Sequence, residues 1–249
     1  MRNLAQLPES DMRRLRGSEL AMVFQDPGNS LNPVHRVGDQ VAEAIRAHRR
    51  IWRREATAEA ETWLKDVGLP DPHQRAHAYP HVLSGGQRQR AMIAIAVANG
   101  PRLLVADEPT TALDVTIQAQ ILDLLAALKT KRDMGLIFIT HNLAVVSEIA
   151  DRVCVMYAGE IVEEGPVAEV FAEPRHPYTA ALMASAPEGD GAQLCAIPGS
   201  VPPPQALPAG CTFAPRCTRA VDNCHSTKPA FVETGPGRAS RCLRWREVA

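Results

Sequence analysis

The chain has 249 residues, enough for one large domain or two small ones, and its 45% hydrophobic and 22% charged residues are typical of a globular protein. Its formal net charge of −1 gives no argument for binding nucleic acid or an anionic membrane through bulk charge. No apolar run approaches the roughly 18 residues that cross a bilayer, and the N-terminus lacks a signal-peptide core. We therefore expect a cytosolic protein that reaches a membrane only through a partner.

The first hundred residues predict a strand followed by helices. Residues 20–25 are predicted as a buried strand, and a polar loop bounded by prolines follows over 26–33. Apolar residues then recur at helical spacing from 37 to 67. Another helix is predicted to begin at the Ser-Gly-Gly turn of residues 84–86 and to run to Ala98, before Asn-Gly-Pro ends it.

The next stretch continues the alternation of strands and helices. Its predicted elements are a buried strand over 103–106, a helix over 117–131, a second buried strand over 136–140, a short helix over 143–150 and a β-hairpin formed by 152–157 and 160–163. Such alternation predicts an α/β domain with a parallel sheet. After about Phe171 prolines become frequent, and 187–208 is predicted as an extended linker before a small cysteine-bearing unit.

Two carboxylates follow the apolar strand 103–106. Asp107 and Glu108 would lie at the carboxyl edge of the sheet, where α/β proteins bind ligands. We expect Asp107 to hold Mg²⁺ through oxygen, and Glu108 to polarise an attacking water molecule.

The Ser84-Gly-Gly-Gln87 turn opens a helix, where glycines let backbone N–H groups approach an anion closely. The helix dipole favours negative charge at this end, and the Ser84 hydroxyl adds a donor. The same sequence is also compatible with a plain helix cap. We expect Ser84, Gly85, Gly86 and Gln87 to bind phosphate.

Three further side chains follow predicted strands or the carboxylates. His141 follows strand 136–140 and could contact a terminal phosphate, although a histidine at a strand end is more often structural. Gln25 ends strand 20–25 and is expected to sense Mg²⁺ or water. Asp114 lies just past the carboxylates and could face a partner subunit.

Four of the six cysteines lie close together in the sequence, as Cys211-x5-Cys217-x6-Cys224-x17-Cys242. Four thiolates suit zinc or an iron–sulfur cluster, yet the spacing matches neither a zinc finger nor a ferredoxin. Scattered, buried cysteines remain the alternative. Cys154, in strand 152–157, is expected in the core.

These motifs resemble those of an ATP-binding cassette (ABC) ATPase and occur in the same order. The Q-loop, signature, Walker B, D-loop and H-loop motifs would correspond to Phe24-Gln25, Leu83–Gln87, Leu103–Glu108, Ala112-Leu-Asp114 and His141. A narrower resemblance, to the importers of oligopeptides, dipeptides and nickel, covers essentially the whole chain. It rests on Gln25-Asp-Pro, Ser30-Leu-Asn-Pro33, His176-Pro-Tyr-Thr-Ala180, Ile197-Pro-Gly199, Val201-Pro202 and Gly210-Cys-Thr-Phe-Ala-Pro-Arg-Cys217.

The resemblance implies a P-loop NTPase fold, with a RecA-like core, a helical subdomain and a cysteine-containing C-terminal extension. The core would comprise 1–33 and 96–170, the helical signature subdomain 34–95, and the extension 171–249. In some peptide importers the corresponding cysteine segment resembles a [4Fe–4S] site. Cofactors implied are therefore ATP, Mg²⁺ and a [4Fe–4S] cluster or Zn²⁺ at the four cysteines.

One expected motif is missing from the sequence. No segment matches the phosphate-binding Walker A loop, Gly-x-x-x-x-Gly-Lys-Ser/Thr. The resemblance implies that roughly 70–80 N-terminal residues, with this loop and the strand before it, are absent. We expect their loss to leave one edge of strand 103–106 unpaired, and we expect the natural protein to be longer.

The implied function is ATP hydrolysis that drives import of peptides, or of nickel, through a separate membrane permease. The chain would lie peripherally on the cytoplasmic face of the inner membrane, with a substrate-binding protein as an indirect partner. It would form a head-to-tail dimer with a second, different ABC ATPase subunit. The alternative is a catalytically incomplete subunit that donates its signature motif to a full-length cassette.

Overall fold

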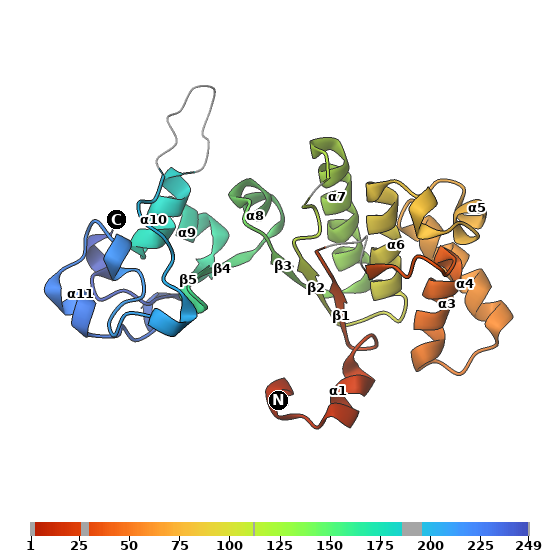
Figure 1. Cartoon of the computed structure of the whole chain (residues 1–249), viewed down its shortest axis with the longest axis horizontal. Coiled ribbons are helices and arrows are strands. Elements are labelled where there is room, and N and C mark those ends of the chain that lie inside the picture. The colour runs from red at the N-terminus through yellow and green to blue at the C-terminus, as the bar shows by residue number, and fades with distance from the viewer. Residues whose placement is uncertain (1–2, 26–29, 112, 186–195, 249) are drawn as a thin grey trace. The chain divides into compact units, whose positions relative to one another are not determined.

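The computed structural model describes residues 3–25, 30–111, 113–185 and 196–248 (Figure 1). The predicted loop over 26–33 and the predicted linker over 187–208 lie partly outside the described residues, and Ala112 and Cys195 lie wholly outside them. Contacts divide the chain into two compact units, Met1–His141 and Asn142–Ala249.

The first unit is built on a parallel sheet of three strands in the order β1-β2-β3. These strands are β1 (Leu20–Val23), β2 (Leu103–Asp107) and β3 (Gly135–Ile139). Successive side chains of a strand point to opposite faces, and on one face Val23, Leu104 and Ala106 are fully buried. The predicted parallel α/β arrangement is thus confirmed.

The central strand β2 is paired on both sides, with β1 on one side and β3 on the other (Figure 1). The expected unpaired edge of strand 103–106 is therefore wrong, because β3 closes it. What is uncovered instead is one face of the sheet, where Met22, Ile137 and Ile139 are 39%, 49% and 45% exposed. The prediction of 136–140 as a buried strand is consequently wrong for that face.

Helices make up most of the remainder of the first unit. The apolar run over 37–67 forms two helices rather than one, because the chain turns extended at Arg49 and a new helix begins after Trp52, whose backbone N–H donates to Glu55. Apolar residues at helical spacing bury one side of each, including Ile45 and Leu64. The helices are α1 (Glu9–Leu15), α3 (Val37–His48), α4 (Arg53–Asp66), α5 (Pro72–Ala76), α6 (Gly85–Val97) and α7 (Val115–Arg132), with 3₁₀ turns η1 (Leu4–Gln6) and η2 (Pro80–Val82).

The second unit is built on an antiparallel sheet in the order β4-β5-β7-β6. The predicted hairpin is confirmed, and its turn at Ala158 and Gly159 has positive φ values of 48° and 82°. The C-terminal residues add two strands to this hairpin. The elements are α8 (Leu143–Ile149), β4 (Arg152–Tyr157), β5 (Glu160–Pro166), α9 (Val167–Ala172), α10 (Pro177–Ala184), α11 (Asp222–Ser226), β6 (Val232–Gly235) and β7 (Arg238–Ser240), with 3₁₀ turns η3 (Pro204–Ala206), η4 (Ala214–Arg216) and η5 (Trp245–Glu247).

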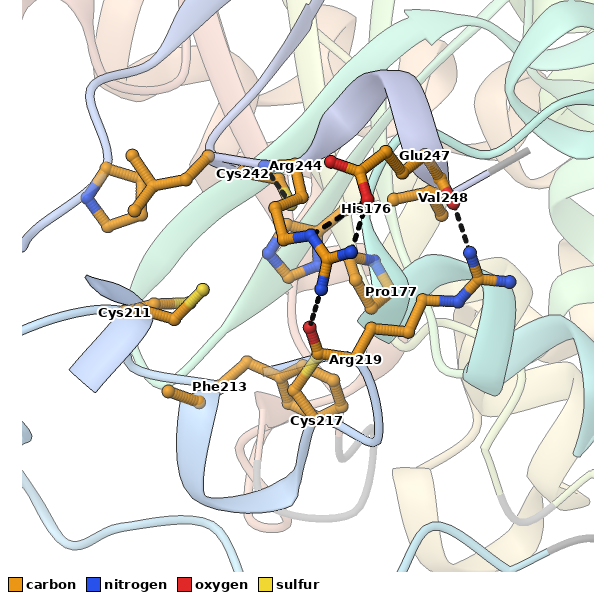
Figure 2. A pocket seen from close by; sticks show the side chains of 14 residues that line it. His176, Pro177, Cys211, Phe213, Cys217, Arg219, Cys242, Arg244, Glu247 and Val248 are labelled. Atoms are coloured by element: carbon orange, nitrogen blue, oxygen red, sulfur yellow. Dashed lines mark hydrogen bonds and ion pairs between the residues drawn. The ribbon is translucent and has the colours of Figure 1, made fainter. Parts of the chain in front are cut away.

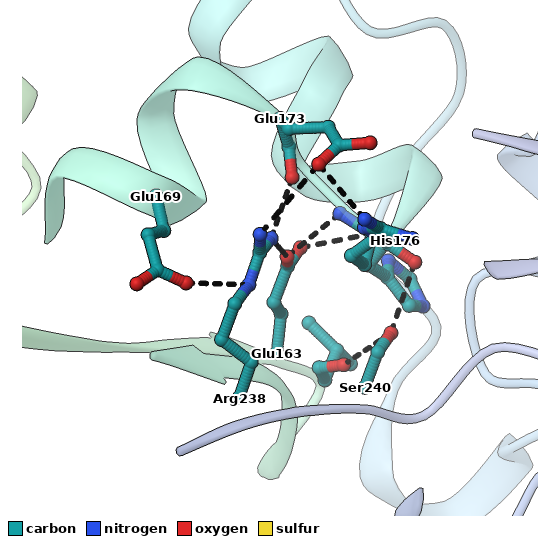
Figure 3. A network of polar contacts seen from close by, with 8 residues as sticks. Glu163, Glu169, Glu173, His176, Arg238 and Ser240 are labelled. Atoms are coloured by element: carbon teal, nitrogen blue, oxygen red, sulfur yellow. Dashed lines mark hydrogen bonds and ion pairs between the residues drawn. The ribbon is translucent and has the colours of Figure 1, made fainter. Parts of the chain in front are cut away.

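A buried polar network holds this sheet to the segment before α10 (Figure 3). The Glu163 carboxylate, fully buried on β5, accepts hydrogen bonds from the backbone N–H groups of Arg175 (2.7 Å) and His176 (2.9 Å). Arg238 on β7 lies 3.4 Å from the same carboxylate and also donates to the Glu173 carbonyl. Buried charges require such partners, so the network ties three separate segments together.

Cys154 departs from its expected place in the core. It is exposed on β4, where it contacts Glu164 at 3.8 Å, because Val155 and Tyr157 take the buried face. The helices of the described residues include none long and apolar enough to span a membrane.

Candidate functional site

The carboxyl ends of the three parallel strands carry the polar residues predicted from the sequence. Gln25 follows β1 closely, Asp107 ends β2 with Glu108 next to it, and His141 follows β3. Because parallel strands end at the same edge of a sheet, these residues meet although they are far apart in the sequence. The structure therefore brings Gln25, Glu108 and His141 into one cluster.

Glu108 is the centre of this cluster. Its Oε2 accepts hydrogen bonds from the Gln25 amide at 2.8 Å and from the Thr111 hydroxyl at 2.9 Å, and its Oε1 lies 3.2 Å from Nδ1 of His141. Its backbone adopts a left-handed φ of 44° and donates to the Ile139 carbonyl of β3. The strained turn holds the carboxylate over the ends of all three strands.

The hydrogen bonds from Thr111 and then His141 lower the pKa of Glu108 below its usual range. The carboxylate is therefore ionised at neutral pH, the form that can accept a proton from water or attract a cation. Thr111 was not predicted as a site residue. The signal in the sequence that could have indicated it is a hydroxyl residue three positions after a carboxylate.

Oxygen donors suited to Mg²⁺ gather at the end of β2. Asp107 is half-buried there, and the Gln25 amide nitrogen donates to Glu108, which leaves the amide oxygen of Gln25 for other contacts. Carboxylate and amide oxygens are the ligands that Mg²⁺ takes in proteins, usually together with water. The donor set of Asp107 and Gln25 thus fits Mg²⁺.

The predicted signature turn forms the first turn of α6. Ser84 is the N-cap residue: its hydroxyl accepts from the Gln87 backbone N–H at 3.3 Å, and the Gln87 side chain accepts from the Ser84 backbone N–H at 3.2 Å. These reciprocal bonds use the Gln87 amide. The backbone N–H groups of Gly85 and Gly86 have no acceptor inside the helix, and Ser84 and Gly85 are exposed.

The two glycines differ in what surrounds them. A Cβ at Gly86 would lie 2.6 Å from a methyl carbon of Ile117 on α7, so glycine is needed there for helix packing. A Cβ at Gly85 would meet only Leu113, at 3.6 Å. Packing therefore does not explain Gly85, whereas close approach by an anion would.

Asp114 lies at the start of α7, beside this turn. Its carboxylate accepts from the Ile117 backbone N–H at 2.9 Å and so caps the helix. The side chain is exposed. Because Leu113 contacts the position of Gly85, the signature turn and Asp114 occupy neighbouring positions on one surface.

The four C-terminal cysteines line one pocket of the second unit (Figure 2). All four are free thiols, and Arg244 donates its backbone N–H to Cys242 at 3.4 Å. Burial raises the pKa of Cys242 to about 11, and it also raises the pKa values of Cys211 and Cys217. The spacing of these four cysteines along the sequence did not by itself predict that they line one pocket.

The fold and the cluster at the strand ends together define the class: a nucleotide-binding cassette of the ABC type. The chain matches the family described as "ABC transporter" over residues 2–111, and the "Oligopeptide/dipeptide transporter, C-terminal region" over residues 162–224.

Similar proteins agree with these matches. A putative peptide import ATP-binding protein of Brucella melitensis is 55% identical over 255 residues, covering 99% of this chain and 75% of the relative. A probable peptide ABC transporter ATP-binding protein of Sinorhizobium fredii is 52% identical, with the same coverage. A dimeric ATP-binding cassette solved with ADP and phosphate has a TM-score of 0.58 and 29% identity, covering 65% of this chain and 68% of that one. The chain belongs to the family of ABC transporter ATP-binding proteins, which are ATPases that use ATP and Mg²⁺.

Proposed function

We propose that this chain is the ATP-binding subunit of an importer of peptides, with nickel as the alternative substrate. It would work at the cytoplasmic face of the inner membrane, bound to permease subunits and served indirectly by a substrate-binding protein. The names of the Brucella and Sinorhizobium relatives and the match of 162–224 to the oligopeptide/dipeptide region support this assignment. Residues 1–33 and 96–170 would form the RecA-like core, 34–95 the helical subdomain and 171–249 the extension.

Within this function we propose distinct roles for the residues at the strand ends. Asp107 and Gln25 would hold Mg²⁺, which neutralises phosphate charge when bound. Glu108 would orient and polarise the attacking water, and His141 would contact the terminal phosphate. The hydrogen bonds that converge on Glu108 from three strand ends support these roles, because they preorganise an ionised carboxylate.

We propose a further role for the surface around α6. Ser84, Gly85, Gly86, Gln87 and Asp114 would complete the ATP site of a second, different cassette in a head-to-tail dimer. The observation that carries this proposal is the exposure of Ser84 and Gly85 beside the start of α7, with the amides of the glycines directed out of the helix end. The signature motif lies within these 249 residues, and in this arrangement it would act on the nucleotide of the partner cassette.

A complementation assay tests both the ATPase assignment and the proposed role of the signature turn in a partner's ATP site. The chain is assayed for ATP hydrolysis alone, and then mixed with the full-length Brucella melitensis relative whose own signature serine has been replaced by arginine. We expect no turnover alone and restored turnover in the mixture. Ser84→Arg in the chain should abolish the rescue, whereas the matched control Ser147→Arg, which replaces an exposed serine of α8, should leave it intact. Robust turnover by the chain alone, lost in Glu108→Gln, would overturn the donor role while leaving the ATPase assignment standing.

The cysteine pocket is proposed to hold a [4Fe–4S] cluster, with Zn²⁺ as the alternative. Thiols whose pKa is raised by burial are protonated at neutral pH, and a metal that displaces the protons stabilises them as thiolates. Four thiols that line one pocket can supply the ligands of either occupant.

Anaerobic purification decides between these occupants. Broad visible absorption with about four iron and four sulfide per chain supports the cluster, and one zinc per chain supports the alternative. Cys217→Ser and Cys242→Ser should each lower the metal content, whereas Cys154→Ser, outside the pocket, should not. A chain that retains neither metal would overturn the proposal.

A further inference from the structure

Helices α4 and α5 bring together three potential metal ligands that have no part in the nucleotide chemistry. Glu61 lies on α4, His73 lies on α5, and His77 follows α5 as its C-cap residue. The two histidines are four residues apart, a spacing that places side chains on the same side of a helical turn. Glu61 is half-buried and both histidines are exposed, so the cluster lies at the surface.

The ligand atoms are already close. Nδ1 of His73 lies 3.0 Å from Oε1 of Glu61, and the two imidazole rings are 4.8 Å apart, tilted by 55°. One ligand atom from each of the three residues can be chosen so that all lie within 4.8 Å of one another. No other group of three histidine, cysteine, aspartate or glutamate residues in the described part of the chain meets this criterion.

The backbone that carries the histidines is firmly placed. Nδ1 of His77 lies 2.9 Å from the His73 carbonyl, so it carries the hydrogen and leaves Nε2 as an electron-pair donor. A Cβ at Gly38 of α3 would lie 2.8 Å from Cβ of Ala76, which shows how closely α5 packs on α3. The Val37 backbone N–H donates to the Ala78 carbonyl at 3.0 Å, just after the site.

We propose that Glu61, His73 and His77 form a binding site for a divalent transition-metal ion, with zinc as the best fit. Two imidazole nitrogens and one carboxylate oxygen are the ligand types that zinc takes, with water in a fourth position. Bonds of about 2.0–2.1 Å require the ligand atoms to approach to about 3.3 Å. The His73 side chain, 79% exposed, can rotate to close that gap because little packs against it.

The ion would bridge α4 and α5 and would stabilise the folded unit by linkage, because it binds the folded state and not the unfolded chain. The site does not depend on the proposed import function, since none of its residues belongs to the nucleotide or cysteine sites.

Metal titration tests this proposal. The metal-free, reduced full chain is titrated with Zn²⁺ by calorimetry, and bound zinc is counted after equilibrium dialysis. We expect the double variant His73→Gln/His77→Gln to bind one ion fewer per chain than the wild type. Glu61→Gln should weaken binding at this site by at least about tenfold. His81→Gln, which replaces another exposed histidine nearby, should match the wild type.

The cysteine pocket can also bind zinc, so Co²⁺ separates the two sites. Thiolate ligation gives intense near-ultraviolet charge-transfer absorption, whereas imidazole and carboxylate ligation gives only weak visible bands. We expect the weak bands to disappear in His73→Gln/His77→Gln and to persist in Cys217→Ser/Cys242→Ser. Unchanged zinc stoichiometry and affinity in the histidine double variant, with wild-type circular dichroism, would overturn the proposal.

Discussion

Lowering the pH should destabilise the second unit through a single buried histidine. His176 is 1% exposed, and its Nδ1 accepts a hydrogen bond from the Tyr178 backbone N–H at 3.0 Å, which caps α10. A proton on Nδ1 would make it a donor that faces the Tyr178 N–H donor, so the cap would be lost. Burial lowers the pKa of His176 from 6.5 to about 4, although a hydrogen bond with the Arg241 backbone works in the opposite direction.

The sign and size of the effect follow from this shift. Since the folded-state pKa lies below the unfolded-state value, the unfolded chain takes up protons first as the pH falls. The contribution of neutral His176 to the free energy of unfolding is fully present above pH 6.5. It declines as the pH falls below 6.5 and is lost entirely below pH 4. A shift from 6.5 to about 4 corresponds to a total loss of about 3 kcal/mol, of which about 2 kcal/mol is lost by pH 5.

Urea unfolding at pH 7 and pH 5 measures this loss when it is followed by the amide resonances of β4 and β5, which report on the second unit alone. His176→Asn keeps an oxygen acceptor for the cap but removes the titrating ring. It also loses packing against Phe213, whose ring centre lies 5.9 Å from that of His176. We therefore expect lower stability at pH 7, with about 2 kcal/mol less dependence on pH than in the wild type.

The control is His225→Asn, which removes an exposed histidine of α11 in the same unit. It should follow the pH dependence of the wild type. If His176→Asn lost as much stability between pH 7 and pH 5 as the wild type, the buried neutral imidazole would not be the cause, and the reasoning would fail.

Other predictions concern the first unit. Leu104→Ala, on the covered face of the sheet, should lower the free energy of unfolding by about 2–5 kcal/mol, whereas Ile137→Ala, on the uncovered face, should cost less than about 1 kcal/mol in urea denaturation. Gly86→Ala should destabilise the packing of α6 on α7 by about 1–3 kcal/mol, because the added carbon meets a methyl group at 2.6 Å; an unchanged melting temperature would contradict this. Thr111→Val removes a hydrogen bond to Glu108, so the pKa of that carboxyl should rise toward its ordinary value in an NMR titration; a pKa unmoved or lowered would refute the role of the hydroxyl.

Local signals accounted for most elements and for the candidate nucleotide residues. The apolar run before Asp107 predicted a strand, and Ser84 three residues before Gln87 predicted a helix start, because a capping box depends only on neighbours in the sequence. The rule that parallel strands end at one edge was enough to place Gln25 and His141 near Glu108.

Other features depended on which segments pair and pack. The pairing of β3 with β2 closed an edge that was expected to be open, and it moved the exposed apolar surface to a face of the sheet. Cys154 is exposed because the other face of the hairpin is the covered one. The apolar pattern of a strand does not indicate which of its two faces will be covered.

What the sequence by itself determined is the family, the order of its motifs and the residues at the strand ends, because each is written in contiguous residues with a fixed local geometry. Only the tertiary structure decided that four spaced cysteines line one pocket, that buried Glu163 on β5 has partners from two other segments, and that Glu61 meets His73 and His77. These contacts join residues on different elements, and their distances depend on how helices and strands pack rather than on their spacing along the chain.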